Sequence, residues 1–290
     1  MLGDCHIHMV LDGVYYRDAI SAHRGHVRDD LIRERLAAYR DAGVTYLRDG
    51  GDAFGVCERA RELAPESGIE YRVPCFPMCL RGRYGMFIGS AYDTLEDYRA
   101  MVGEVRRRRG DFIKLMISGI LDFNHYGSVT SEPLTPAQIR ALIDIAHGEG
   151  FSVMAHANGA RTIAAAAEAG VDSIEHGAYM DADTVRALAG SGVVWVPTLA
   201  TVGDLIGNGR YPDSVLTRIL DGQLENIAEY VRLGGRLALG SDAGAYTVYH
   251  AKGAQDEFEL ISRALGDATE AVLEAGEDEI RRRFRWGSVG

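Results

Sequence analysis

The sequence contains little cysteine and no long apolar run. Its four cysteines, at positions 5, 57, 75 and 79, are sparse for 290 residues and form no paired CxxC spacing, which argues against a disulfide scaffold or a zinc knuckle. No run approaches the roughly 20 apolar residues of a membrane span. The chain reaches Asp4, His6 and His8 without a basic and then apolar leader. We therefore predict a cytoplasmic protein with no membrane partner.

Positive charge is also in deficit. The 31 Lys and Arg against 42 Asp and Glu give a net charge of −11, which repels polyanions and argues against a nucleic-acid partner. Hydrophobic residues make up 47% and charged residues 25%, as in ordinary globular proteins. The sequence therefore predicts a folded protein that acts on a small molecule. A homo-oligomer is compatible with this prediction.

Short apolar, β-branched runs alternate with segments of helical period along the whole chain, which is typical of βα units around a parallel sheet. One such helix has Thr135 as N-cap and Pro136 at its first position. The pattern predicts a single-domain (β/α)8 TIM barrel spanning residues 1–290. The eight expected strands lie at 2–8, 44–48, 70–76, 112–117, 152–156, 173–176, 193–196 and 236–241.

Two connections are longer than the usual βα loop and are expected to be functional. They cover residues 10–29, after the first expected strand, and 117–134, after the fourth. Both follow strands, and barrel active sites are built from the loops on that side.

Histidines and an aspartate stand at the ends of several expected strands. His6 and His8 form an HxH motif, and alternate residues of a strand share one face. His156 and His176 close the fifth and sixth strands, and Asp242 follows the eighth. An isolated HxH motif arises easily by chance, but side chains at these strand ends converge on one mouth of a barrel. Nitrogen and oxygen ligands of this kind suit zinc and similar divalent ions.

Lys114 lies inside the apolar strand DFIKLMISG, between Ile113 and Leu115. It is expected to point opposite to these neighbours, into the barrel. A buried lysine is costly unless it is paired, neutralised or modified. The alternative is a lysine at a strand end whose amine extends to solvent.

This ordered set resembles the amidohydrolase superfamily, which carries HxH on the first strand, lysine on the fourth, histidines on the fifth and sixth, and aspartate on the eighth. The phrases IKLMISG, AHANGARTI and AAAAEAGVDSIEHG look most like its imidazolonepropionase and Xaa-Pro dipeptidase branch. The resemblance implies two divalent metal ions, with zinc the expected metal, and a carboxylated Lys114 as bridging ligand. It implies that His6, His8 and Asp242 hold the more buried ion, and His156 and His176 the more exposed one.

The sequence also departs from that branch. The metal motif starts at residue 4, so the additional β-sandwich of typical relatives is expected to be absent. AHANG carries Asn158 where relatives often have histidine, and LRGRYG stands where a histidine-containing loop is expected. Candidates for substrate binding are chosen by their position in βα loops. That they are ordinary surface loop residues with no substrate role is an equally good interpretation. They are Arg81, Arg83, Tyr84, Tyr179, Tyr249 and His250.

The expected reaction is hydrolysis of a C–N bond in an amide, dipeptide or cyclic amide. Two metal ions lower the pKa of a bridging water and create a hydroxide nucleophile. Asp242 is the expected general base and acid, because it would take the proton and return it to the leaving nitrogen. A lactonase or phosphotriesterase using the same centre, and a catalytically silent metal-binding barrel, are the alternatives.

Overall fold

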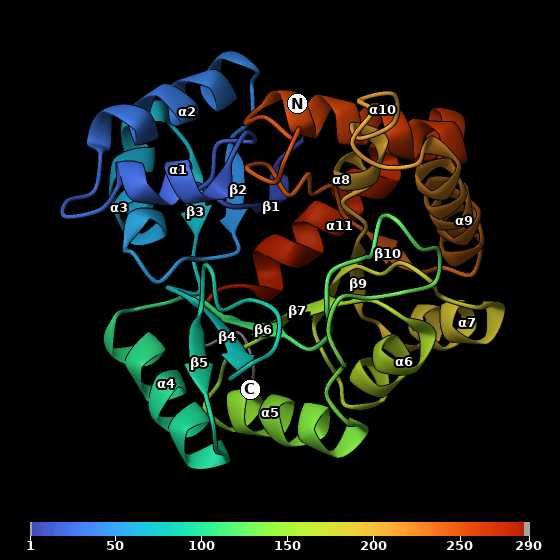
Figure 1. Ribbon diagram of the computed structural model, residues 1–290, viewed down its shortest axis with the longest axis horizontal. Helices are drawn as coiled ribbons and strands as arrows, with labels where there is room; N and C mark the ends of the chain where they lie inside the picture. The colour runs from blue at the N-terminus through green and yellow to red at the C-terminus, as the bar shows by residue number, and fades with distance from the viewer. Residues whose placement is uncertain (1, 287–290) are drawn as a thin grey trace.

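The protein is described by a computed structural model that covers residues 2–286. These residues form a (β/α)8 barrel in which a ring of helices surrounds parallel strands (Figure 1). The predicted domain limits, 1–290, include residue 1 and residues 287–290, which lie outside the described part. The strands are β1 (Asp4–Ile7), β2 (Tyr46–Asp49), β3 (Glu70–Arg72), β4 (Pro77–Leu80), β5 (Ser90–Tyr92), β6 (Ile113–Met116), β7 (Val153–Ala157), β8 (Ser173–His176), β9 (Val194–Val196) and β10 (Arg236–Leu237).

The helices alternate with the strands along the chain and form the outer layer of the barrel. They are α1 (Tyr16–Ala22), α2 (Asp29–Asp41), α3 (Val56–Leu63), α4 (Leu95–Arg107), α5 (Pro136–Gly148), α6 (Ala160–Glu168), α7 (Ala182–Ser191), α8 (Ala200–Gly203), α9 (Asp213–Arg232), α10 (Lys252–Leu265) and α11 (Thr269–Arg283). Two short 3₁₀ helices cover Ala64–Ser67 and Gly266–Ala268. The expected boundary at α5 is confirmed, because the Thr135 side chain caps the helix and Pro136 begins it.

The barrel closes where its last strand meets its first. The Cys5 amide donates to the Leu239 carbonyl at 2.9 Å, and the Asp242 amide donates to the His6 carbonyl at 2.7 Å. The last strand has ladder pairing only over β10, but its continuation to residue 243 still bonds to β1. A strand is therefore present at each of the eight expected places, the third in two pieces, and the expected barrel is confirmed.

The third strand is the main difference from the sequence-based prediction. The expected strand over 70–76 divides into β3, which pairs with β2, and β4, which pairs with β6. Pro74 has no amide to donate to a ladder, and Cys75 has a φ of 66°, outside the strand region. The strand therefore breaks there and resumes at Pro77. The short β5 pairs with β4 as an additional strand.

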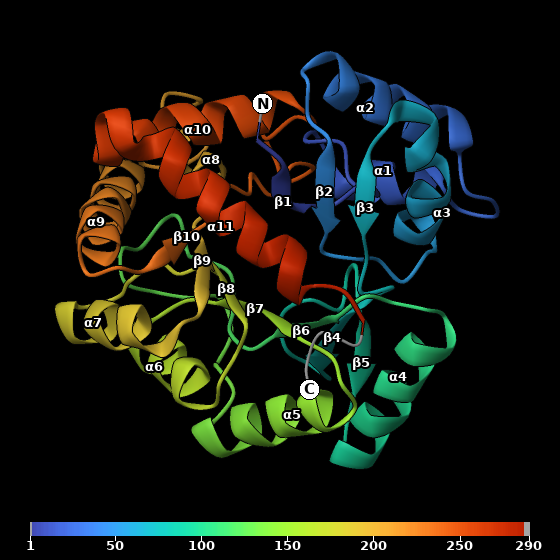
Figure 2. The same cartoon turned by 180° about the vertical axis from the view of Figure 1, so that it is seen from behind.

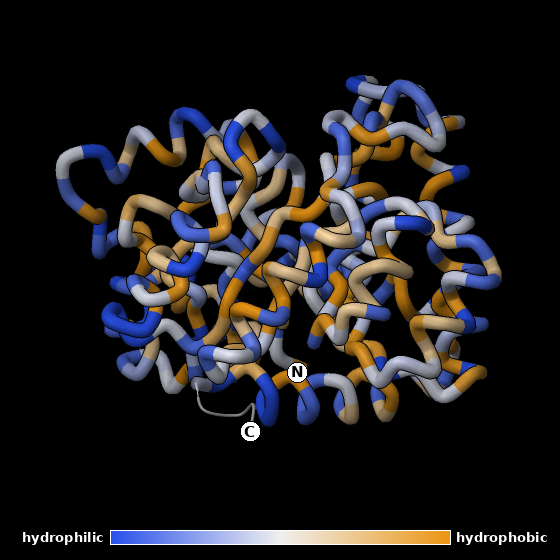
Figure 3. The backbone as a smooth tube through the Cα atoms, turned by 90° about the horizontal axis from the view of Figure 1, so that it is seen from below, coloured by the Kyte–Doolittle hydropathy of each residue, from blue (hydrophilic) through white to orange (hydrophobic). Residues whose placement is uncertain are grey.

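Apolar side chains fill the interior of the barrel and the space between its strands and the outer helices. They also close the end of the barrel where the strands begin. Most apolar strand and inner helix positions are fully buried, and the hydrophilic stretches of chain lie mainly at the outer turns (Figure 3). Helix α11 crosses the barrel on the face seen in Figure 2. Its Ile280, with the following Phe284, joins a buried cluster with Cys5, Phe112 and Val194 near the strand starts. The opposite end, where the strands finish, is left for the site.

No helix among the described residues is long and apolar enough to cross a membrane. These residues also form no β-sandwich beside the barrel.

Candidate metal centre

The HxH motif lies at the end of β1 inside the barrel mouth. His6 is 1% exposed and His8 7%, and their ring centroids are 5.5 Å apart. A β-carbon at Gly50 would lie 2.3 Å from His8 Cε1, so the imidazole packs directly on a backbone without a side chain. This close approach requires glycine at the end of β2.

Asp242 meets both histidines from the last strand. Its Oδ1 lies 3.6 Å from His6 Nε2 and 3.5 Å from His8 Nε2, and one ligand atom from each residue fits within a 4.8 Å span. Asp242 has a φ of 60°, a strained value for a residue with a side chain. The preceding Ser241 holds the turn, because its hydroxyl donates to Asp4 Oδ2 at 2.5 Å and its amide donates to Asp4 Oδ1 at 2.9 Å.

The other predicted ligands complete one cluster. The His156 and His176 rings are 4.5 Å apart, and His176 lies 5.2 Å from His6. Lys114 is 1% exposed, and its Nζ lies 3.4 Å from His6 Nε2. The structure therefore brings all six predicted metal residues together at the mouth.

Neighbouring groups orient the two outer histidines. His156 Nε2 lies 3.1 Å from the Gly119 carbonyl, which can only accept, so this nitrogen carries the proton and Nδ1 keeps its lone pair. His176 Nδ1 lies 2.6 Å from Thr198 Oγ1. Both His176 and Thr198 have positive φ, 71° and 50°. Backbone strain thus accumulates at the cluster, as it often does at functional sites.

Burial keeps these imidazoles neutral. Burial, with the nearby Lys114, lowers the pKa of His8 and His156 to about 3 and that of His6 and His176 well below the ordinary value. Burial also raises the pKa of Asp242 to about 7 and lowers that of Lys114 to about 8. Neutral imidazole is the form that binds metals. Four such rings and a carboxylate within one small volume fit a divalent cation site.

A buried ion pair that the sequence patterns did not predict supports the cluster from below. Glu175 Oε2 lies 2.9 Å from His6 Nδ1, and Glu175 Oε1 lies 3.0 Å from the guanidinium of Arg48. Both residues are fully buried. The sequence does contain a signal for this ion pair, because Arg48 and Glu175 are charged residues inside apolar strands, where an unpaired charge is costly.

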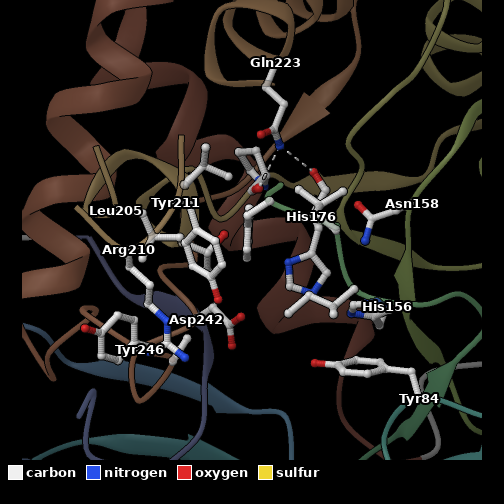
Figure 4. A pocket seen from close by; sticks show the side chains of 17 residues that line it. Tyr84, His156, Asn158, His176, Leu205, Arg210, Tyr211, Gln223, Asp242 and Tyr246 are labelled. Atoms are coloured by element: carbon white, nitrogen blue, oxygen red, sulfur yellow. Dashed lines mark hydrogen bonds between the residues drawn. The ribbon is translucent and has the colours of Figure 1, made fainter. Parts of the chain in front are cut away.

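A cavity with two lobes opens above the cluster. The first lobe has a volume of about 170 Å³ and the second about 380 Å³. Both lobes include Tyr84, His156, His176, Arg210 and Asp242. Figure 4 shows the side chains that line the first lobe. The two long connections contribute to the walls, with Tyr15 and Tyr16 in the second lobe and Leu121 and Phe123 in the first.

Of the predicted substrate residues, only Tyr84 lines these lobes, with its ring 4.9 Å from the His156 ring. Arg81 pairs with Asp93 at the surface at 2.8 Å. His250 Nε2 bonds the Leu11 carbonyl at 2.8 Å, and the Tyr179 ring packs against Tyr126.

Tyr249 is 48% exposed. Neither it nor Arg83 lines either lobe. A substrate role for Arg81, Arg83, Tyr179, Tyr249 and His250 stays a prediction. Tyr84 keeps its expected place at the cavity, and its contact with substrate also stays a prediction.

The cavity also contains loop residues that were not among the candidates selected from the sequence. Arg210 and Tyr211 lie in the connection between α8 and α9, and Tyr246 follows the last strand. The stretch IGNGRYPD combines turn residues with one arginine and one tyrosine after a strand. That composition marks a loop on the active side of a barrel and could have identified them.

A barrel with donor side chains at the carboxyl ends of its strands is the arrangement of a barrel enzyme site. Residues 23–278 match the Amidohydrolase family. This match covers most of the chain, and the protein belongs to that family. The family resemblance seen in the sequence is therefore confirmed, whereas the imidazolonepropionase and Xaa-Pro dipeptidase branch stays a prediction.

Sequence relatives extend beyond the present chain. An uncharacterized protein of Mycobacterium tuberculosis is 31% identical over 257 residues, which cover 86% of this chain and 66% of the relative. Ochratoxinase of Aspergillus niger is 23% identical over 286 residues, covering 83% of this chain and 57% of the relative. The chain thus spans between half and two thirds of the length of these relatives.

Solved structures share the fold. The A. niger ochratoxinase structure superposes with a TM-score of 0.75 at 21% identity, covering 99% of this chain and 71% of that one. A Xaa-Pro dipeptidase with bound methionine gives a TM-score of 0.72 at 21% identity, covering 100% and 77%. At this level of identity, the likeness establishes the barrel alone.

Proposed function

We propose that the protein is a metal-dependent hydrolase of C–N bonds in amides, dipeptides or cyclic amides. The observation that carries this proposal is the convergence of His6, His8, Lys114, His156, His176 and Asp242 at the barrel mouth beside a two-lobed cavity. Membership of the Amidohydrolase family supports it. Ochratoxinase and a Xaa-Pro dipeptidase among the similar proteins favour a C–N bond over an ester or phosphoryl bond.

The residues divide into two ligand groups. His6, His8 and Asp242 would hold one divalent ion, and His156 and His176 a second, with zinc the proposed metal. Lys114 would join the groups after carboxylation, which requires a neutral amine, and burial lowers its pKa to about 8. Bound divalent ions supply Lewis acidity and lower the pKa of a coordinated water.

Asp242 would move the proton. Without a bound ion, burial raises its pKa to about 7; beside a bound ion, its carboxylate would serve as general base and then as general acid. It lies between the histidines and the cavity, so it can accept a proton from the attacking water and deliver it to the leaving nitrogen. Tyr84, against His156, would cover the reacting bond from the opposite wall.

The proposal is tested by metal analysis and a substrate panel. The purified protein, loaded with zinc, is expected to bind up to two equivalents per chain and to hydrolyse N-acyl amino acids or dipeptides. Asp242→Asn should abolish turnover while retaining part of the metal. His125→Asn is the control, because the side chain of this exposed loop histidine pairs with Asp122 and lines neither lobe of the cavity.

Two outcomes would replace the proposal. Preferential turnover of lactones or organophosphates would make the protein a lactonase or phosphotriesterase. Bound zinc without turnover on any panel, and no effect of Asp242→Asn, would indicate a catalytically silent metal-binding barrel.

A further inference from the structure

Asn158 places a buried amide side chain next to the outer histidines. It follows β7 two residues after His156, is 1% exposed and lines the first lobe of the cavity. Figure 4 shows it beside His156. A buried amide is costly unless its donor and acceptor are bonded within the protein, so its partners show what this side chain holds.

The side-chain amide of Asn158 joins the loops that follow the two neighbouring strands. Its Nδ2 donates to the Gly119 carbonyl, after β6, at 3.3 Å, and its Oδ1 accepts from the Ala178 amide, after β8, at 3.1 Å. A carbonyl can only accept and a backbone amide can only donate, so these two partners fix the orientation of the side chain. The backbone amide of Asn158 also donates to Ser118 Oγ at 2.9 Å.

The Gly119 carbonyl is the group that keeps the proton of His156 on Nε2. It accepts from His156 Nε2 at 3.1 Å, from Asn158 Nδ2, and from the Ser118 hydroxyl at 3.1 Å. A β-carbon at residue 119 would lie 2.4 Å from the Ser131 amide nitrogen, so this peptide packs closely against the returning half of its own loop. Loop packing and Asn158 together fix the position of the carbonyl.

The tautomer decides which atom His156 can offer to a metal ion. With the proton on Nε2, the lone pair remains on Nδ1, and only an unprotonated ring nitrogen binds a metal. The other tautomer would place an N–H where a ligand atom is needed. A partner of the nitrogen that does not bind the metal commonly orients a histidine ligand in this way.

We propose that Asn158 is a positioning residue that holds the Gly119 carbonyl and thereby fixes the tautomer of His156. The proposal rests on the proposed function only because it treats His156 as a metal ligand. It gives a role to the asparagine of AHANG, where the sequence departs from the family pattern that it resembles.

The tautomer is measured by NMR on the full-length protein with isotope-labelled histidine, at neutral pH and without added metal. Correlations between ring protons and ring nitrogens show which nitrogen carries the proton, and His156→Gln identifies the signals. His156 should carry its proton on Nε2 in the unmodified protein and become a mixture of both tautomers in Asn158→Leu. Asn226→Leu is the matched control, because Asn226 Nδ2 also donates to a backbone carbonyl after β8, that of Met180, at 3.1 Å.

Zinc binding provides a second readout, measured by chelator competition on the zinc-loaded protein. Asn158→Leu should weaken by about 10–100-fold the zinc equivalent that His156→Gln removes. The other equivalent should remain nearly unchanged, and Asn226→Leu should leave both unchanged. If Asn158→Leu does not fold, Asn158→Ser replaces it, because the space that serine leaves admits water to the Gly119 carbonyl and the Ala178 amide.

The outcomes separate this role from the proposed function. A proton on Nδ1 of His156 in the unmodified protein, or an unchanged tautomer in the Asn158 variant, would overturn the proposal. Equal loss of both zinc equivalents in that variant would overturn it as well. A changed tautomer in a protein that binds no zinc or cleaves no amide would support the role of Asn158 and contradict the proposed function alone.

Discussion

The guanidinium of Arg48 and the carboxylate of Glu175 form a fully buried ion pair in the centre of the barrel, with Nη2 3.0 Å from Oε1. Arg48 also donates to the Cys5 carbonyl and to Ser173 Oγ. Its guanidinium carbon lies 4.3 Å from the Phe284 ring centroid. Because Glu175 also contacts His6 Nδ1, the pair links the floor of the barrel to the candidate metal centre.

Glu175→Gln should weaken zinc binding. A carboxylate on the far nitrogen of a histidine ligand fixes its tautomer and raises its basicity, and loss of such a partner costs about 10–100-fold in metal affinity. The substitution also leaves Arg48 as an unpaired buried charge, which costs about 3–5 kcal/mol of stability. Competition with a chelator and urea unfolding measure the two effects.

Glu257→Gln is the matched control for that substitution. Glu257 is equally buried, but burial raises its pKa to about 8, so it is largely uncharged at neutral pH. Glutamine can accept the hydrogen bond that the Ala200 amide donates to its carboxyl group at 2.7 Å. The zinc affinity of the Glu257→Gln variant should equal that of the unmodified protein. Equal losses in both variants would show that His6 does not depend on Glu175.

Gly50→Ala should also lower the zinc affinity, because the added methyl group would lie 2.3 Å from His8 Cε1 and displace the imidazole. Gly103→Ala provides the comparison, since Gly103 lies within α4 and a β-carbon there meets nothing within 4 Å. That variant should keep its zinc affinity and gain about 0.5–1 kcal/mol of stability. Unchanged zinc binding by Gly50→Ala would rule out His8 as a ligand.

The His147–Asp172 pair should stabilise the protein only at lower pH. His147 Nε2 lies 2.9 Å from Asp172 Oδ2, and this hydrogen bond raises the pKa of His147 in the folded state. The stabilisation is fully present below the unfolded pKa of about 6.5 and disappears as the pH rises through the folded value. His147→Gln should cost about 0.5–1 kcal/mol at pH 5.5 and far less at pH 9. Denaturant titrations at both pH values measure this, and an equal cost at both would contradict it.

The sequence predicted most of the architecture because strand periodicity and strand-end placement are local signals. His6, His8, His156, His176 and Asp242 could be selected from the sequence alone, since parallel strands bring their carboxyl ends to one mouth.

The inward-pointing Lys114 followed from the same alternation of strand side chains. The break at Pro74 and Cys75 depended on a backbone conformation that no periodicity reveals.

The loops were predicted least well. Arg81 and Arg210 both follow strands, and only tertiary packing decides that the first meets Asp93 at the surface while the second faces the cavity. The partnership of Arg48 with Glu175 joins residues 127 positions apart, so sequence alone offered two isolated charges.

Anomalous diffraction at the zinc edge, from crystals of the zinc-loaded protein, tests the central claim most directly. We predict one peak among His6, His8 and Asp242 and a second beside His156 and His176, with Lys114 between them. The absence of any peak at these side chains, with zinc bound elsewhere or not at all, would contradict the account.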